Sequence, residues 1–250
     1  MRKLLVIALA MPVALGLPAV AVAQTNSYDF TGSVPSGGSK AKPKAAGFTF
    51  NFAVDDTAGN TPAPVKSYKF TIGGLKVNTA AVKQTCTAAS INAAGDAKGC
   101  SSKAIVGTGS VSAVVGVSGQ PLSTKAGTCT LRMTAYAAGT DKVALFLNGG
   151  TPGAPACLVP ISQAIDAKWS NGSKGASLAF TVPELLRHQV GLDIPVLSVK
   201  STWKQLTGTK GKTKVAYVGS TGCKGQRSAT AAFTDETGTS TPVTKTIGKC

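Results

Sequence analysis

Residues that could perform acid–base chemistry are few in this chain: one His, two Glu and eight Asp among 250 residues. The single histidine, His188, stands beside Arg187, and a Ser–His–Asp triad would need partners from distant parts of the chain. No H-E-x-x-H, G-x-S-x-G, Walker or dinucleotide-binding motif occurs. We therefore predict no catalytic residue, no cofactor and no enzymatic activity.

Paired carboxylates support one alternative function. A glycosidase needs two carboxyl groups at a defined separation, whereas neighbours in sequence on a strand point to opposite faces. A secreted hydrolase of polysaccharides or esters would have to gather its carboxylates from several loops. The candidates are Asp55, Asp56, Asp166, Asp193, Asp235 and Glu236.

Possible metal ligands can be judged from their spacing in the sequence. The segment from Asp55 to Asn60 offers closely spaced oxygen ligands that suit calcium, but it lacks a complete EF-hand pattern. An Asx-stabilised turn is the default for such a segment. Zinc is disfavoured because no Cys-x-x-Cys occurs and His188 alone cannot complete a ligand set. We predict no metal site.

The six cysteines indicate disulfides, because an even number in an exported chain usually pairs. Six cysteines allow 15 pairings, and the sequence alone does not choose among them. We predict the sequential pairing, in which each bond closes a short loop: Cys86 with Cys100, Cys129 with Cys157, and Cys223 with Cys250.

An export signal is predicted for residues 1–23. Arg2 and Lys3 precede an apolar stretch, and Ala21-Val22-Ala23 supplies the small residues that a signal peptidase reads. A retained membrane anchor is the alternative, because Leu4 to Ala23 is long enough to span a bilayer. We expect a secreted or extracellular protein without a transmembrane segment in its mature part.

Positive charge dominates the surface chemistry. The chain has a net charge of +16, from 26 Lys and Arg against 10 Asp and Glu. Such a charge favours contact with cell-wall phosphates, acidic lipid head groups or nucleic acid, and the charge alone does not choose among them. We expect an anionic cell-wall polymer as the partner and no specific nucleic acid. The best binding candidate is a long basic hairpin from Thr207 to Thr213 whose stems carry Trp203 and Tyr217. Its lysines are Lys204, Lys210, Lys212 and Lys214. The alternative is a solvated loop whose charge prevents aggregation of a strand edge.

Short β-strands are the elements that we expect to position the cysteines and lysines named above. Phe48, Phe50, Phe52 and Val54 alternate with polar residues, as expected of a half-buried strand. Thr128 to Ala137 and Val143 to Leu147 form the most persuasive hairpin, and Asn171-Gly172 indicates the turn of another. About ten such runs at short spacing favour an all-β, disulfide-bonded β-sandwich, immunoglobulin-like or jelly-roll-like.

One or two short helices are expected beside the strands. The Ala-rich segment between Cys86 and Cys100 has room for about two helical turns. Pro183 to Gly191 begins with Pro and ends with Gly, which is typical of helix ends. We expect three parts: the signal at 1–23, a flexible basic lead-in at 24–46 and a single sandwich domain at 47–250. Within the lead-in, Tyr28 to Gly32 could add a short edge strand.

The tracts Tyr68 to Val77, Cys100 to Gly109 and Lys212 to Cys223 resemble those of a group of uncharacterised secreted proteins of actinobacteria. The resemblance covers roughly 67–250, and Ser101 stands where those proteins usually have Pro. It implies an exported, all-β protein without an assigned activity, and it transfers no functional residue.

We therefore expect an exported, non-catalytic protein near the cell envelope that binds an anionic polymer through its Lys-rich loops. The alternatives are the hydrolase described above and a passive component of a surface layer.

Overall fold

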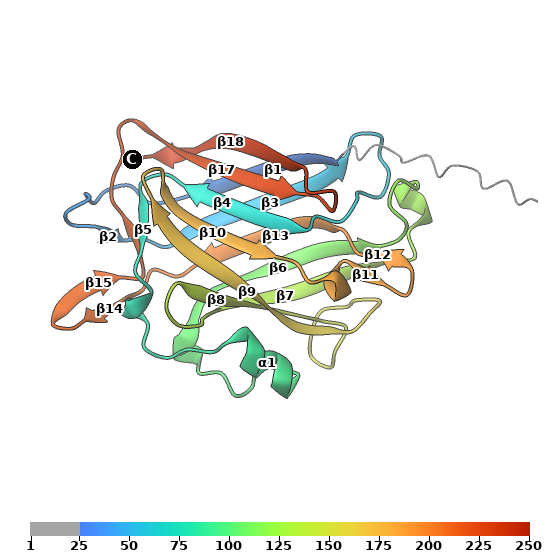
Figure 1. Ribbon diagram of the computed structural model, residues 1–250, viewed down its shortest axis with the longest axis horizontal. Coiled ribbons are helices and arrows are strands. Elements are labelled where there is room, and N and C mark those ends of the chain that lie inside the picture. Colours follow the sequence, from blue (N-terminus) through green and yellow to red (C-terminus); the bar gives the residue numbers. More distant parts are fainter. Residues whose placement is uncertain (1–25) are drawn as a thin grey trace, which may run out of the picture.

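The computed structural model of the protein describes residues 26–250, so the predicted signal at 1–23 lies outside the described residues. Eleven strands form one antiparallel sheet (Figure 1). In spatial order they are β1 (Asn26–Ser33), β3 (Phe48–Asp56), β13 (Val196–Trp203), β6 (Ile105–Val115), β7 (Gly127–Ala137), β8 (Lys142–Gly149), β9 (Ile161–Gly172), β10 (Gly175–Thr181), β4 (Ser67–Ile72), β17 (Gln226–Thr234) and β18 (Ser240–Lys249).

The sheet curls until its two edge strands lie beside each other, which makes it nearly barrel-shaped. Asp29 of β1 forms an ion pair with Lys245 of β18. Tyr28 of β1 stacks on Phe233 of β17, with ring centroids 4.4 Å apart. The predicted all-β, disulfide-bonded fold is confirmed, but the two separate layers of a sandwich are not: one curled sheet encloses the core.

Smaller elements decorate this sheet. Three short sheets are formed by β2 (Lys44–Ala45), β16 (Val218–Ser220) and β5 (Leu75–Val77), by β11 (His188–Gln189) and β12 (Leu192–Asp193), and by β14 (Thr207–Lys210) and β15 (Thr213–Ala216). The helical elements are α1 (Ala88–Ala94) and the 3₁₀ turns η1 (Thr79–Ala81), η2 (Ser102–Ala104), η3 (Leu122–Thr124) and η4 (Glu184–Leu186).

Alternation along the strands fills the inside of the curled sheet. On β3 the residues Phe48, Phe50, Phe52 and Val54 are buried, as the sequence predicts, while the residues between them are partly exposed. Phe50 and Phe70 approach each other with ring centroids 4.6 Å apart. Aromatic rings from β3, β4, β10 and β17 thus form one side of the core.

Helix α1 covers part of the outer face of the sheet. It lies in sequence between Cys86 and Cys100, which form the predicted disulfide. Thr87 caps its first turn by accepting a hydrogen bond from Ser90 N at 3.1 Å, and Gly95 ends it with a positive φ of 71°. Ile91 packs against the outer residues of β8, and this explains why β8 is buried on both faces.

The other two disulfides also follow the predicted sequential pairing. Cys129–Cys157 joins β7 to the loop before β9, and Cys223–Cys250 joins the loop before β17 to the residue after β18. The predicted hairpin of 128–137 and 143–147 is confirmed as β7 and β8.

Three local predictions need correction. Pro183 to Gly191 is not a helix: after the single turn η4 the chain reverses into β11 and β12, because Ile194 N donates to Arg187 O at 2.7 Å. The expected flexible lead-in at 24–46 is shorter than predicted: residues 26–33 form edge strand β1, the alternative that the sequence allows at 28–32, with Phe30 buried.

The hairpin predicted around Asn171-Gly172 is present, but Asn171 lies in strand β9 rather than in the turn, and the chain reverses at residues 173–174. The side-chain amide of Asn171 bonds both backbone groups of Val77, at 2.8 and 2.9 Å, and so joins β9 to β5.

Candidate functional site

The predicted basic hairpin is present as β14 and β15, which extend beyond the main sheet at one end of the molecule (Figure 1). Lys204, Lys210, Lys212 and Lys214 are all exposed. None of them takes part in the ion pairs found among residues 26–250. These four cations are therefore available to a partner.

The aromatic part of that prediction is wrong. Trp203 is 5% exposed and Tyr217 is fully buried, so neither ring flanks the hairpin on the surface. Trp203 instead stacks on Phe48 inside the sheet, with ring centroids 5.4 Å apart. Contacts of the hairpin with a partner would consequently be ionic rather than aromatic.

Further lysines surround the hairpin. We call this region the basic end: it comprises the hairpin with β2, β5, β16 and the loop before β17, and its exposed lysines are Lys42, Lys44, Lys76, Lys204, Lys210, Lys212, Lys214 and Lys224. β2, β16 and β5 form one short sheet, which brings lysines from distant parts of the sequence together.

Carboxylates gather at the opposite end. Strand β3 runs from the basic end toward Asp55 and Asp56, and β17 runs the same way toward Asp235 and Glu236. We call this region the acidic end. It holds six of the ten acidic residues: Asp55, Asp56, Glu184, Asp193, Asp235 and Glu236.

The only histidine of the chain lies at the acidic end, between two of these carboxylates. His188 Nδ1 is 2.8 Å from Asp193 Oδ1, and His188 Nε2 is 2.6 Å from Glu236 Oε1. Arg187 also forms an ion pair with Glu236. Both contacts of the imidazole are hydrogen bonds when both ring nitrogens carry a proton. We refer to Arg187, His188, Asp193 and Glu236 as the clasp.

Asp193 is held from a second side. Ser118 N donates to Asp193 Oδ2 at 3.0 Å. Partial burial pushes the pKa of Asp193 upward, but the hydrogen bonds from Ser118 and the contact with His188 outweigh it, so the pKa is lowered. Asp193 is therefore stabilised as a carboxylate.

The hydrolase alternative finds little support in this geometry. Asp193 and Glu236 do converge, but the His188 ring stands between them, where a scissile bond would have to lie. Ser118 Oγ donates to Pro62 O at 3.2 Å rather than to His188, so no serine nucleophile is activated here. Asp166 lies elsewhere, in β9.

The Asp55 to Asn60 segment forms a turn stabilised by a side chain. Asp56 Oδ1 accepts hydrogen bonds from Ala58 N at 2.9 Å and Asn60 N at 3.2 Å, as expected of an Asx-stabilised turn. Within residues 26–250 no group of three or more His, Cys, Asp or Glu side chains is placed to hold a metal ion. The same residues contain no helix long and apolar enough to cross a membrane.

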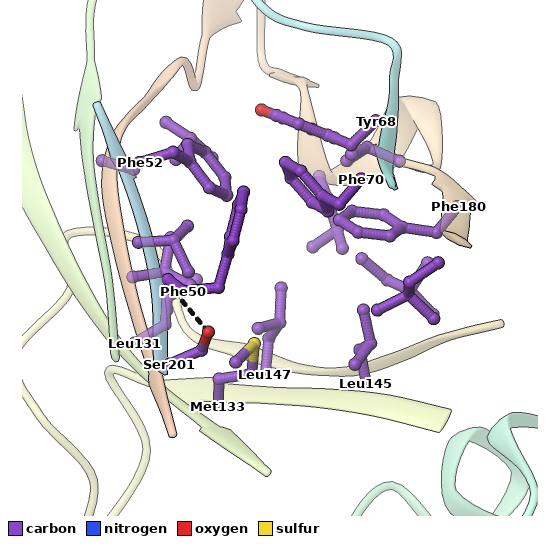
Figure 2. Close-up of a pocket in the computed structure, with 18 of the residues that line it drawn as sticks. Phe50, Phe52, Tyr68, Phe70, Leu131, Met133, Leu145, Leu147, Phe180 and Ser201 are labelled. Atoms are coloured by element: carbon purple, nitrogen blue, oxygen red, sulfur yellow. Dashed lines mark hydrogen bonds between the residues drawn. The ribbon is translucent and has the colours of Figure 1, made fainter. Parts of the chain in front are cut away.

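Inside the curled sheet lies a cavity of about 90 Å³ that the sequence does not reveal (Figure 2). Aromatic side chains of β3, β4 and β10 form one wall, and Leu131, Met133, Leu145 and Leu147 of β7 and β8 form the opposite one. Of the residues that the structure describes, none with a charged side chain lines it. The hydroxyl of Ser201 points toward the cavity wall and donates to Phe50 O.

Comparison with protein-family models, with curated proteins and with solved structures finds no match to this chain. The resemblance to secreted actinobacterial proteins therefore stays a prediction. What the structure itself defines is a disulfide-bonded all-β protein with opposite charges at its two ends and an apolar cavity between them.

Proposed function

We propose that the protein is an exported, non-catalytic binding protein of the cell envelope whose basic end attaches it to an anionic polymer. The observation that carries this proposal is the separation of charge. The exposed lysines of the hairpin have no ion-pair partner among residues 26–250, and most of the carboxylates lie at the other end.

Charge separation favours one orientation on a polyanion. A phosphate-bearing chain is attracted to the basic end and repelled by the acidic end, so encounters are steered toward the hairpin. Exposed Lys–phosphate contacts are individually weak and screened by salt, so affinity has to come from several lysines acting together. The hairpin provides Lys210, Lys212 and Lys214 on one projecting element, and Lys204 lies in the segment that leads into it from β13.

Export is supported independently. Three disulfides are compatible with an oxidising, extracellular environment, in which such bonds persist. The predicted signal points the same way. A cell-wall polymer rich in phosphate is then the polyanion that the protein would meet first.

Binding to immobilised polyphosphate and to purified phosphate-rich cell-wall polymer tests the proposal. The variant with Lys204, Lys210, Lys212 and Lys214 changed to Gln should bind about tenfold or more weakly at low salt, with a shallower salt dependence. The matched control changes four exposed lysines outside the basic end to Gln: Lys66, Lys69, Lys125 and Lys200.

Equal losses in the two variants would mean that net charge, rather than the basic end, drives binding. Absence of binding by the unaltered protein at low salt would refute the proposal. An uncharged dextran serves as the polymer control, since it should not bind under any of these conditions.

A further inference from the structure

We propose that the interior of the curled sheet is a binding site for a small apolar molecule, and that the molecule enters at the acidic end beneath residues 183–194. This proposal is independent of the attachment proposed for the basic end. It rests on the cavity, on the chemistry of its walls and on the segment that closes it.

The walls of the cavity select against polar occupants. Its lining is aliphatic and aromatic, and the Ser201 hydroxyl already donates to a backbone carbonyl. Water needs two to four polar partners to occupy a buried site, whereas apolar cavities stay dry and accept apolar guests. A hydrocarbon, or the alkyl part of a larger molecule, is therefore the class of ligand that fits.

The volume limits the size of that ligand. An apolar cavity of about 150 Å³ accepts benzene or xenon. The cavity here, at about 90 Å³, is smaller. Xenon or a chain of a few carbon atoms should fit without rearrangement, and a larger ring should require some of the wall to move.

The segment 183–194 closes the cavity at the acidic end. Leu186 and Ile194 are buried and line the cavity, while Leu185 and Val190 of the same segment are 60% and 99% exposed. Val190 also has a φ of 51°, which is costly for a β-branched residue. The two exposed apolar side chains and the strained backbone make this segment easier to open locally than a strand of the sheet.

The clasp holds the segment closed from outside. His188 and Asp193 belong to the segment, and Glu236 lies in the turn between β17 and β18. The segment is also attached by the backbone pairing of Asp193 with Gly116 and by the hydrogen bond from Ser118 N. Breaking the contacts of Glu236 would therefore remove one attachment and ease local opening, without removing any residue that lines the cavity. Ligand entry and ligand binding can thus be changed separately.

Methyl NMR under xenon pressure tests the site in the unaltered protein. The signals of Met133, Leu145 and Leu147 should shift, and those of Ile91 in α1, on the outer face of the sheet, should not. A Leu145→Ala variant should enlarge the cavity and bind benzene about tenfold more tightly than the unaltered protein. Ile91→Ala, which removes a buried side chain from the other face of the sheet, is the matched control and should leave benzene binding unchanged.

Two results would overturn the site: cavity methyl signals of the unaltered protein that do not respond to xenon, or equal benzene binding in Leu145→Ala and Ile91→Ala. The entrance is tested by benzene exchange in the Leu145→Ala background. Glu236→Gln should speed exchange several-fold without changing the dissociation constant. Asp166→Asn, which neutralises an exposed carboxylate on β9, should not. Equal exchange rates in those two variants would place the entrance elsewhere.

Discussion

At the scale of single residues, Arg227 is the least expected feature of the core. Its side chain is fully buried and donates to Gly73 O at 2.7 Å and to Ser220 Oγ at 2.9 Å, but its Nε has no hydrogen-bond partner in the described part of the chain. Burial lowers the pKa of Arg227, and no carboxylate forms an ion pair with it within residues 26–250. A buried cation without a counter-charge carries a large desolvation cost.

The volume of Arg227 should consequently matter more to stability than its charge. We expect Arg227→Met to change the free energy of unfolding by about 1 kcal/mol or less. The substitution removes two hydrogen bonds, but it also removes the desolvation cost of the buried charge, and the two effects offset each other. Arg227→Ala should cost about 3 kcal/mol, because it leaves a cavity. Urea denaturation of the two variants checks this, and similar losses in both would show that the hydrogen bonds dominate.

Asp193 links the clasp to acid stability. Its pKa is lowered in the folded protein, so its contribution to stability is present above the ordinary Asp pKa of about 3.9 and is lost as the pH falls through the folded value. We expect Asp193→Asn to be less stable than the unaltered protein at pH 7 and the difference to shrink below about pH 4. Unfolding measured at both pH values tests this. A difference that does not depend on pH would contradict it.

At the scale of elements, strand alternation was the reliable signal and helix-end signals were not. Phe48 to Val54 and the β7–β8 hairpin were predicted from the large apolar residues that alternate along each strand and face the core. Pro183 and Gly191 are typical helix ends, yet Leu186 and Ile194 both have to reach the core, and a reversal at Val190–Gly191 allows this whereas a helix would not. Tertiary contacts thus override local preference in this segment.

Helix α1 offers a test of local stabilisation. Thr87→Ala removes the side chain that accepts from Ser90 N, and it should lower the free energy of unfolding by about 1 kcal/mol. Thr209→Ala on the exposed strand β14 is the control and should change it by less than about 0.5 kcal/mol. Thermal or urea unfolding distinguishes the two, and equal effects would mean that the cap is not formed in solution.

At the scale of the whole molecule, the sequence predicted the strand content and the disulfides but not the closure of the sheet. Whether strands form two layers or one curled sheet depends on which edges meet, and β1 and β18 are more than 200 residues apart in sequence. The cavity was also beyond prediction, because alternation shows which residues face inward but not how completely they fill the space. The separation of charge depends in the same way on the directions of the strands.

The Cys223–Cys250 disulfide should stabilise the whole fold. It closes a loop of 27 residues in sequence separation, and changing both cysteines to Ser should cost about 3–4 kcal/mol, mainly by freeing the unfolded chain. Urea unfolding of the double variant measures the loss. Because neither cysteine lines the cavity, the xenon response should persist below the unfolding transition, and its disappearance would show that the bond also shapes the interior.

The opposite placement of lysines and carboxylates has a geometric consequence for an anchored molecule. Once the hairpin rests on a negatively charged wall, electrostatic repulsion turns Glu184, Asp193 and Glu236 outward to the surrounding medium. The basic end, which attaches the protein, is then opposite the acidic end, through which an apolar ligand would enter. Attachment of the basic end to the polymer would therefore leave the proposed ligand entrance at the acidic end exposed to the medium.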